Sequence, residues 1–386
     1  MTAFAAALIC TLCAAAQAAP TLPTEQEIAA ALKDLAAVSG FHIKRSVSFH
    51  LITRAEAGRY FAERIQQSLH PKQVRAEELT LKKFGFVPAD FDLAAETTRL
   101  MTEQATAFYD YHTRQLYIAD WTPPALRETA LVHELAHALA DQNYSIGHYL
   151  GRVQKDSEAA SAREAVVEGQ ATLLAAQVEY TRHGAATHDT AAAAEYPEFD
   201  RAPLYFRETL LFPYQQGSQF MQQVLGRQGR AAWRDVFEQP PQSTRQILQV
   251  QAYFDRELPT HPALPPMPRG KAKNVVEGSL GELEHRILLQ QFGSSDTLSE
   301  AWRGCRFRLL EENGLTMLLY ASEWADDAAA ARFFEAYEKV LRGKSKSLRV
   351  DVRGETRLTG MADDGYFEVA LKGARVTSRQ GWAEAF

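Results

Sequence analysis

Residues 131–139 read Leu-Val-His-Glu-Leu-Ala-His-Ala-Leu, and this stretch decides how the rest of the sequence is interpreted. On a helix, His133 and His137 lie one turn apart on the same face, so both imidazole rings point at one spot. Two imidazoles at that spacing suit zinc, which takes nitrogen ligands in tetrahedral sites. Glu134 lies about 100° round the helix from His133, where it can reach a water molecule beside the metal without being a ligand. The stretch therefore predicts a site for one zinc ion.

A catalytic zinc ion needs a third protein ligand and an open fourth position. The metzincin pattern, with a third histidine six residues after His137, is absent because Asn143 stands there. A later helical segment offers two carboxylates, Glu164 and Glu168, four residues apart on one helix face. His148 is a weaker candidate for the third ligand. The spacing alone leaves the choice among these three open.

Around the second carboxylate the sequence resembles the gluzincin peptidases. Residues 168–172 read Glu-Gly-Gln-Ala-Thr and match the Glu-Gly-x-Ala motif that supplies the third zinc ligand in that group. The resemblance implies that Glu168 is the ligand. Glu164, one turn earlier, would then lie behind it, or serve as the reserve ligand.

Residues 212–217, Phe-Pro-Tyr-Gln-Gln-Gly, look like the Pro-Tyr-x-x-Gly helix start of gluzincin aminopeptidases. There the tyrosine donates a hydrogen bond to the oxyanion, a role that the resemblance gives to Tyr214. A tyrosine that only packs fits this short motif equally well.

The order of motifs resembles a family of exported bacterial proteins classed as HExxH zinc metallopeptidases. The likeness runs from about Phe108 through the segment 240–248, Pro-Pro-Gln-Ser-Thr-Arg-Gln-Ile-Leu, to a C-terminal region around 302–337. It implies peptide-bond hydrolysis, with Glu134 as the general base. The Gly-x-Met-Glu-Asn motif of gluzincin aminopeptidases is missing before the zinc helix, so aminopeptidase specificity is not expected.

Two alternating runs, 107–111 and 115–119, flank His112-Thr-Arg114 and predict a β-hairpin just before the zinc helix. An edge strand there can bind an extended peptide by adding it to the sheet. The second run is the candidate, although an ordinary sheet edge has the same pattern. Its residues are Gln115, Leu116, Tyr117, Ile118 and Ala119.

Asp141 follows His137 by one helical turn. A zinc-binding histidine usually donates its other ring N–H to a carboxylate or carbonyl, and Asp141 is the expected acceptor for His137. Alternatively, Asp141 only ends the helix.

The remaining pattern predicts an α+β protein with a mostly helical, zincin-like domain over residues 20–257. Capping boxes at Thr24/Glu27 and Thr53/Glu56 mark two helix starts. Five prolines fall between Leu258 and Pro268, which predicts a linker over 258–273. The segment 274–386 then reads as a smaller α+β domain, with a hairpin across Asn313-Gly314.

Residues 1–19 resemble a signal peptide, with an apolar run ending in Ala16-Gln17-Ala18, although a basic start is lacking. The expectation is export to a periplasm or medium, with no membrane span after cleavage. After cleavage, Cys305 would be the one remaining cysteine.

The formal net charge is -6, with interspersed signs, so nucleic acid is not an expected partner. The expected partner is a peptide or protein substrate.

Two other functions fit the same motifs. The first is a zinc amidohydrolase that acts on a non-peptide or cell-wall amide, since the metal ligands would be shared. The second is an inactive zincin scaffold that binds partners in the cell envelope. Retention of Glu134 argues against the scaffold, because binding alone does not require a general base.

Overall fold

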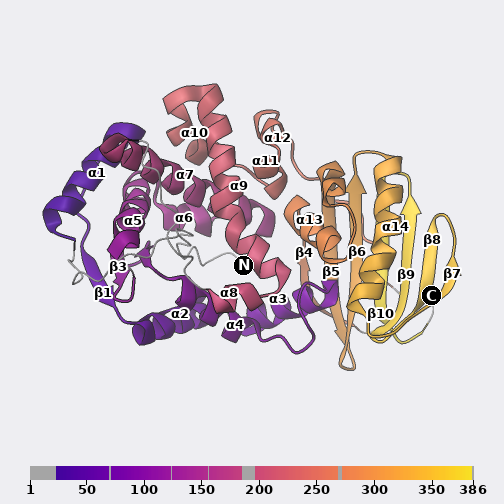
Figure 1. Cartoon of the computed structure of the whole chain (residues 1–386). Helices are drawn as coiled ribbons and strands as arrows, with labels where there is room; N and C mark the ends of the chain where they lie inside the picture. The colour runs from indigo at the N-terminus through magenta and orange to yellow at the C-terminus, as the bar shows by residue number, and fades with distance from the viewer. Residues whose placement is uncertain are drawn as a thin grey trace.

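A computed structural model describes residues 23–68, 71–122, 124–154, 156–184, 196–267 and 272–384. The chain is α+β, as predicted, with a helical N-terminal region followed by a β-rich C-terminal part (Figure 1). The predicted signal peptide lies outside the described residues. Within them, no helix combines the length and the apolar character needed to cross a membrane.

The first helices begin where the sequence predicts. Thr24 and Thr53 each accept a hydrogen bond from the backbone N–H three residues later, and the glutamate there bonds back to the threonine N–H. The helices of this part are α1 (Glu25–Ser39), α2 (Arg54–Ser68), α3 (Pro71–Phe84) and α4 (Leu93–Gln104).

A small three-stranded sheet precedes the zinc helix, with strand order β1-β3-β2. The predicted hairpin is present as β2 (Ala107–Asp110) and β3 (Gln115–Ala119). In addition, β1 (Phe49–Ile52) pairs in parallel with β3. Strand β3 is therefore central, not an edge.

The central position of β3 makes the predicted peptide-binding strand wrong. The N–H of Leu116 donates to Ser48 O of the β1 segment, and the N–H of Ala119 donates to Thr106 O on the other side. Within the described residues, β3 is paired on both sides and offers a peptide no free edge. The residues excluded as strand-adding partners are Gln115, Leu116, Tyr117, Ile118 and Ala119.

The middle of the N-terminal region is built around three long helices, α5 (Pro124–Tyr144), α7 (Ser157–His183) and α9 (Leu204–Gln228). Helix α7 packs against both α5 and α9, and all three contribute to one continuous core. The shorter helices are α6 (Ile146–Gly151), α8 (Pro197–Arg201), η1 (Gly229–Ala231), α10 (Ala232–Glu238), α11 (Thr244–Leu248) and α12 (Val250–Phe254).

Helices α7 and α9 cross with their backbones in contact at two glycines. A Cβ atom on Gly169 would lie 2.2 Å from the carbonyl carbon of Gly217. A Cβ atom on Gly217 would lie 2.1 Å from the carbonyl oxygen of Ala165. Both positions therefore need glycine because any side chain would overlap backbone atoms that cannot move independently.

The C-terminal part contains a seven-stranded antiparallel sheet with order β4-β5-β6-β10-β9-β8-β7. Asn313 and Gly314 both have positive φ and form the predicted tight turn between β5 and β6. Helix α14 (Asp327–Lys344) packs on the sheet. The other elements are β4 (Lys273–Gly278), α13 (Glu282–Gln291), η2 (Asp296–Ala301), β5 (Trp302–Glu312), β6 (Leu315–Trp324), β7 (Leu348–Arg353), β8 (Arg357–Ala362), β9 (Gly365–Lys372) and β10 (Arg375–Trp382).

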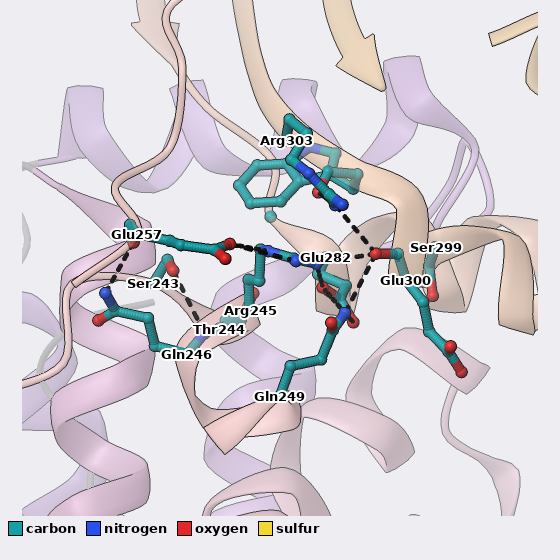
Figure 2. A network of polar contacts seen from close by, with 12 residues as sticks. Ser243, Thr244, Arg245, Gln246, Gln249, Glu257, Glu282, Ser299, Glu300 and Arg303 are labelled. Carbon is teal, nitrogen blue, oxygen red and sulfur yellow. Dashed lines mark hydrogen bonds and ion pairs between the residues drawn. The ribbon is translucent and has the colours of Figure 1, made fainter. Parts of the chain in front are cut away.

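The segment 240–248 forms a polar junction between the two parts (Figure 2). Arg245 donates to Glu282 of α13 at 3.1 Å and to the carbonyl of Glu300 at 2.8 Å. Gln249 also donates to the Glu282 carboxylate. Burial nevertheless raises the pKa of Glu282 to about 7, against the opposing effects of these two partners. The junction thus depends on a buried ion pair.

Substitution of Arg245 by Ala should lower the free energy of unfolding by about 3 to 5 kcal/mol, because it leaves a buried carboxylate without its cation. The loss should be larger at pH 8 than at pH 5, since a proton can neutralise Glu282 at the lower pH. Urea unfolding at both pH values measures this loss in the free energy of unfolding. The double substitution Arg245→Met with Glu282→Gln should recover most of the loss; equal losses in the single and double variants would contradict the pairing.

Helix α3 makes a further contact between the parts. Its Lys83 Nζ donates to Asp364 Oδ2 at 2.6 Å and to the carbonyl of Thr316 at 2.7 Å. The Phe84 ring lies 5.3 Å from Phe307 and 5.8 Å from Tyr320, both on the C-terminal sheet. An N-terminal helix therefore completes the C-terminal core.

Candidate metal centre

Helices α5 and α7 bring three ligand atoms together. The Nε2 atoms of His133 and His137 lie 3.0 Å apart, and Glu168 Oε2 lies 3.2 Å and 3.1 Å from them. All three side chains are buried. Among the described residues they form the one group of three or more His, Cys, Asp or Glu side chains with metal-binding spacing.

The size of this triangle fits a zinc ion. Zinc–ligand bonds of about 2.0 to 2.1 Å at tetrahedral angles place neighbouring ligand atoms about 3.3 Å apart. The three observed separations are 3.0, 3.1 and 3.2 Å. The donor set of two imidazoles and one carboxylate is also one that zinc uses in catalytic sites.

Hydrogen bonds alone cannot account for the triangle. Each imidazole Nε2 carries either one hydrogen or one lone pair, and an ionised carboxylate carries no hydrogen. If both His133 and His137 donate to Glu168, two N–H groups face each other across 3.0 Å. If one histidine instead accepts, its lone pair faces the carboxylate. With Glu168 ionised, at least one edge is repulsive in every arrangement, and a cation at the centre would remove the repulsion.

The electrostatics favour the protonation state that a metal ligand needs at Glu168 and His133, but not at His137. Burial by itself raises the pKa of Glu168, but His137 and His133 lower it more strongly, to about 2, so the carboxylate is ionised. Burial lowers the pKa of His133, which keeps a lone pair available. The pKa of His137 is raised because the neighbouring Glu168 outweighs its burial. Metal binding would displace the resulting proton.

Glu134 lies beside the triangle without belonging to it. Its Oε2 atom accepts a hydrogen bond of 2.7 Å from the backbone N–H of Tyr109. Its Oε1 atom is buried and has no hydrogen-bond partner among the described residues. Burial and the charge of Glu168 raise the pKa of Glu134 to about 8, against the opposing effects of His137 and the Tyr109 N–H. Such a carboxyl group can hold and release a proton near neutral pH.

Two tyrosines flank the histidines. The Tyr214 ring, from α9, lies 6.1 Å from the His133 ring at 30°, so the structure brings the predicted tyrosine to the site. The Tyr111 ring meets the His137 ring edge-on, at 6.2 Å and 89°. Burial, together with Glu168 and Glu134, raises the pKa of Tyr111 well above its usual value. Sequence reasoning missed Tyr111 because it read Tyr109-Asp-Tyr111 only as a strand.

Glu164 lies one turn before Glu168 and is not part of the triangle, so the structure does not support it as the reserve ligand. Burial and the charge of Glu168 raise the pKa of Glu164 to about 8. It lines a small cavity with Tyr205 of α9 and Glu284 of α13. His148, in α6, is outside the triangle as well.

The expected contact between Asp141 and His137 is wrong. Both carboxylate oxygens of Asp141 are engaged elsewhere, by Arg45 at 3.0 Å, the Tyr109 hydroxyl at 3.1 Å and the Ile146 N–H at 2.9 Å. The Nδ1 atom of His137 has no hydrogen-bond partner among the described residues. Asp141 does not end the helix either, because α5 continues to Tyr144.

The comparison with known proteins gives a match in the C-terminal part of the chain, away from the metal site. A protein-family model described as "Domain of unknown function (DUF8575)" matches residues 270–385. No curated protein and no solved structure matches the chain. The matched region begins inside the segment predicted as a linker and contains none of the metal-site residues.

Proposed function

We propose that this protein is a zinc-dependent hydrolase of peptide bonds. His133, His137 and Glu168 would hold one zinc ion, and Glu134 would act as the general base. The observation that carries the proposal is the triangle of ligand atoms, with edges of 3.0 to 3.2 Å. Beside it, the buried Glu134 carboxyl group has one oxygen that no described residue contacts by a hydrogen bond. The gluzincin resemblance of residues 168–172 supports the same ligand set.

A zinc ion held there would polarise the scissile carbonyl and lower the pKa of water. Glu134 would take a proton from water through its free Oε1 atom and deliver it to the leaving amine. The Tyr214 ring lies beside His133 and the Tyr111 ring beside His137, so each hydroxyl is a candidate to stabilise negative charge on the carbonyl oxygen.

Edge strand β2 lies beside the site, since its Tyr109 N–H bonds to Glu134. All four residues of β2 are buried and the Tyr109 N–H is already bonded to Glu134, so this edge does not decide the substrate. A peptide substrate is favoured over a small amide by the resemblance of the motif order to zinc metallopeptidases.

Zinc binding tests the ligand set directly. The purified wild-type protein should bind one zinc ion per chain, and Glu168→Ala should weaken binding at least about 100-fold, more than the loss of an outer-shell partner does. Glu164→Ala, one turn away on the same helix, is the matched control and should keep wild-type affinity. Competition with a zinc-sensitive dye measures all three. Unchanged affinity in Glu168→Ala would rule out this carboxylate as a ligand.

Cleavage of a broad peptide library then separates the candidate functions. A peptidase should cleave in the presence of zinc and stop when a chelator removes it. Stoichiometric zinc with no peptide cleavage would exclude the peptidase. Activity on cell-wall or other non-peptide amides would then indicate the amidohydrolase, and inertness on every amide would indicate the binding scaffold.

A further inference from the structure

Tyr109 contacts helix α5 at two separate points. Its backbone N–H donates to Glu134 Oε2 at 2.7 Å, and its hydroxyl donates to Asp141 Oδ2 at 3.1 Å. Glu134 and Asp141 are seven residues apart, which is about two helical turns, so they lie on the same face. The edge strand is thus fixed to the zinc helix both at the proposed base and two turns beyond it.

The acceptor of the Tyr109 hydroxyl is itself held in place. Arg45 Nη2 lies 3.0 Å from Asp141 Oδ2 and 3.3 Å from the Tyr109 hydroxyl oxygen. The other oxygen of Asp141 accepts the Ile146 N–H at 2.9 Å. Tyr109 and Asp141 are both buried, where such bonds are stronger than in water.

Arg45 is placed by the next residue of the zinc helix. The Gln142 side-chain oxygen accepts the N–H groups of Lys44 at 2.7 Å and of Arg45 at 3.0 Å. The Gln142 amide group donates back to the carbonyl of Arg45 at 3.2 Å. The extended segment that carries Arg45 is therefore tied to α5 independently of Asp141.

These contacts matter for Glu134 because the terminal torsion of a carboxylate side chain has a broad energy minimum. One fixed hydrogen bond to Oε2 decides where Oε1 points, and here Oε1 has no hydrogen-bond partner in the described part of the chain. We infer that Tyr109, Asp141 and Arg45 form a clamp that positions Glu134, with Tyr109 as the positioning residue. The catalytic consequence rests on the proposed function, whereas the positioning itself does not.

The substitution Tyr109→Phe tests the clamp, since it removes the hydroxyl and keeps the ring and the backbone N–H. We expect kcat to fall about 10- to 100-fold because the base is held less accurately. KM should stay within about twofold and zinc affinity should not change, since neither a ligand nor a binding surface is removed.

Tyr253→Phe is the matched control. Tyr253 is also buried, and its hydroxyl donates one hydrogen bond, to Gln239 O at 2.9 Å, away from Glu134. Tyr253→Phe should lose about 1 kcal/mol of stability, the usual value of one hydrogen bond, and should keep wild-type kcat. Tyr109→Phe should lose about 1.5 to 3 kcal/mol, because the partners of its hydroxyl are charged. An equal fall of kcat in both variants would mean that the effect is only structural.

Hydrogen exchange of the amide at position 109 gives a readout that does not need activity. Measured at single-residue resolution, it should be at least about 10-fold faster in Tyr109→Phe than in the wild type, and unchanged in Tyr253→Phe. Faster exchange in a protein that cleaves no peptide would uphold the clamp and reject the proposed function. Wild-type kcat and wild-type exchange in Tyr109→Phe would overturn the clamp while leaving the function intact.

Discussion

Glu134→Gln should retain one zinc ion per chain and lose peptide hydrolysis by about 10³-fold, near the middle of the range for general acid–base catalysis. Glutamine can still accept the Tyr109 N–H through its side-chain oxygen, so the local structure should persist. It cannot take a proton from water at neutral pH. Initial rates on a quenched-fluorescence peptide, with zinc content measured on the same samples, test this.

Glu128→Gln provides the control for that experiment. Glu128 lies on the same helix, is well exposed, and pairs at 3.5 Å with Arg182. The charge change is the same but occurs away from the metal site, so hydrolysis should be unaffected. Wild-type turnover in Glu134→Gln would show that this residue is not the general base.

Gly169→Ala should lower the free energy of unfolding by about 3 kcal/mol, at the upper end of the usual cost of overpacking. The added methyl group would lie 2.2 Å from the carbonyl carbon of Gly217. No side-chain rotation can relieve a contact with backbone, so α7 and α9 must separate. Because α9 carries Tyr214 and α7 carries Glu168, hydrolysis should fall as well. Urea unfolding in the presence of chelator measures stability without a contribution from zinc.

Gly226→Ala makes the same chemical change on α9, where a Cβ atom would meet nothing within 4 Å. Alanine has the higher helix propensity, so this variant should gain up to about 1 kcal/mol. A loss of stability in Gly169→Ala together with a gain in Gly226→Ala would attribute the loss to the helix crossing. A stable Gly169→Ala variant would mean that α7 and α9 can shift apart at little cost.

The local features of this chain could be predicted because nearby residues determine them. The capping threonines at 24 and 53 satisfy the first N–H groups of their own helices, and Asn313-Gly314 supplies the positive φ angles of its turn. The convergence of His133 and His137 follows from helical geometry alone. Glu168 was found through a motif, and the structure places its carboxylate 3.1 to 3.2 Å from both rings.

The predictions that were wrong or incomplete concern residues whose contacts come from segments distant in sequence. The pattern of 115–119 contains no sign that a strand more than sixty residues earlier pairs with it in parallel. Likewise, Asp141 could be placed on the correct helix, but its real partners, Arg45 and Tyr109, come from an extended segment and a strand. Tyr111 reaches His137 only because the hairpin folds over α5, which no local pattern encodes.

The attachment of α3 to the C-terminal sheet has a consequence for synthesis of the chain on the ribosome. Lys83 and Asp364 are 281 residues apart in sequence, so Phe84 and its neighbours leave the ribosome long before their partners exist. At 5 to 20 residues per second, the delay is roughly 15 to 60 s. Throughout that time an aromatic side chain and a lysine that are buried in the finished protein face solvent. Final association of the two parts must therefore follow translation, and premature termination would yield a fragment prone to aggregate.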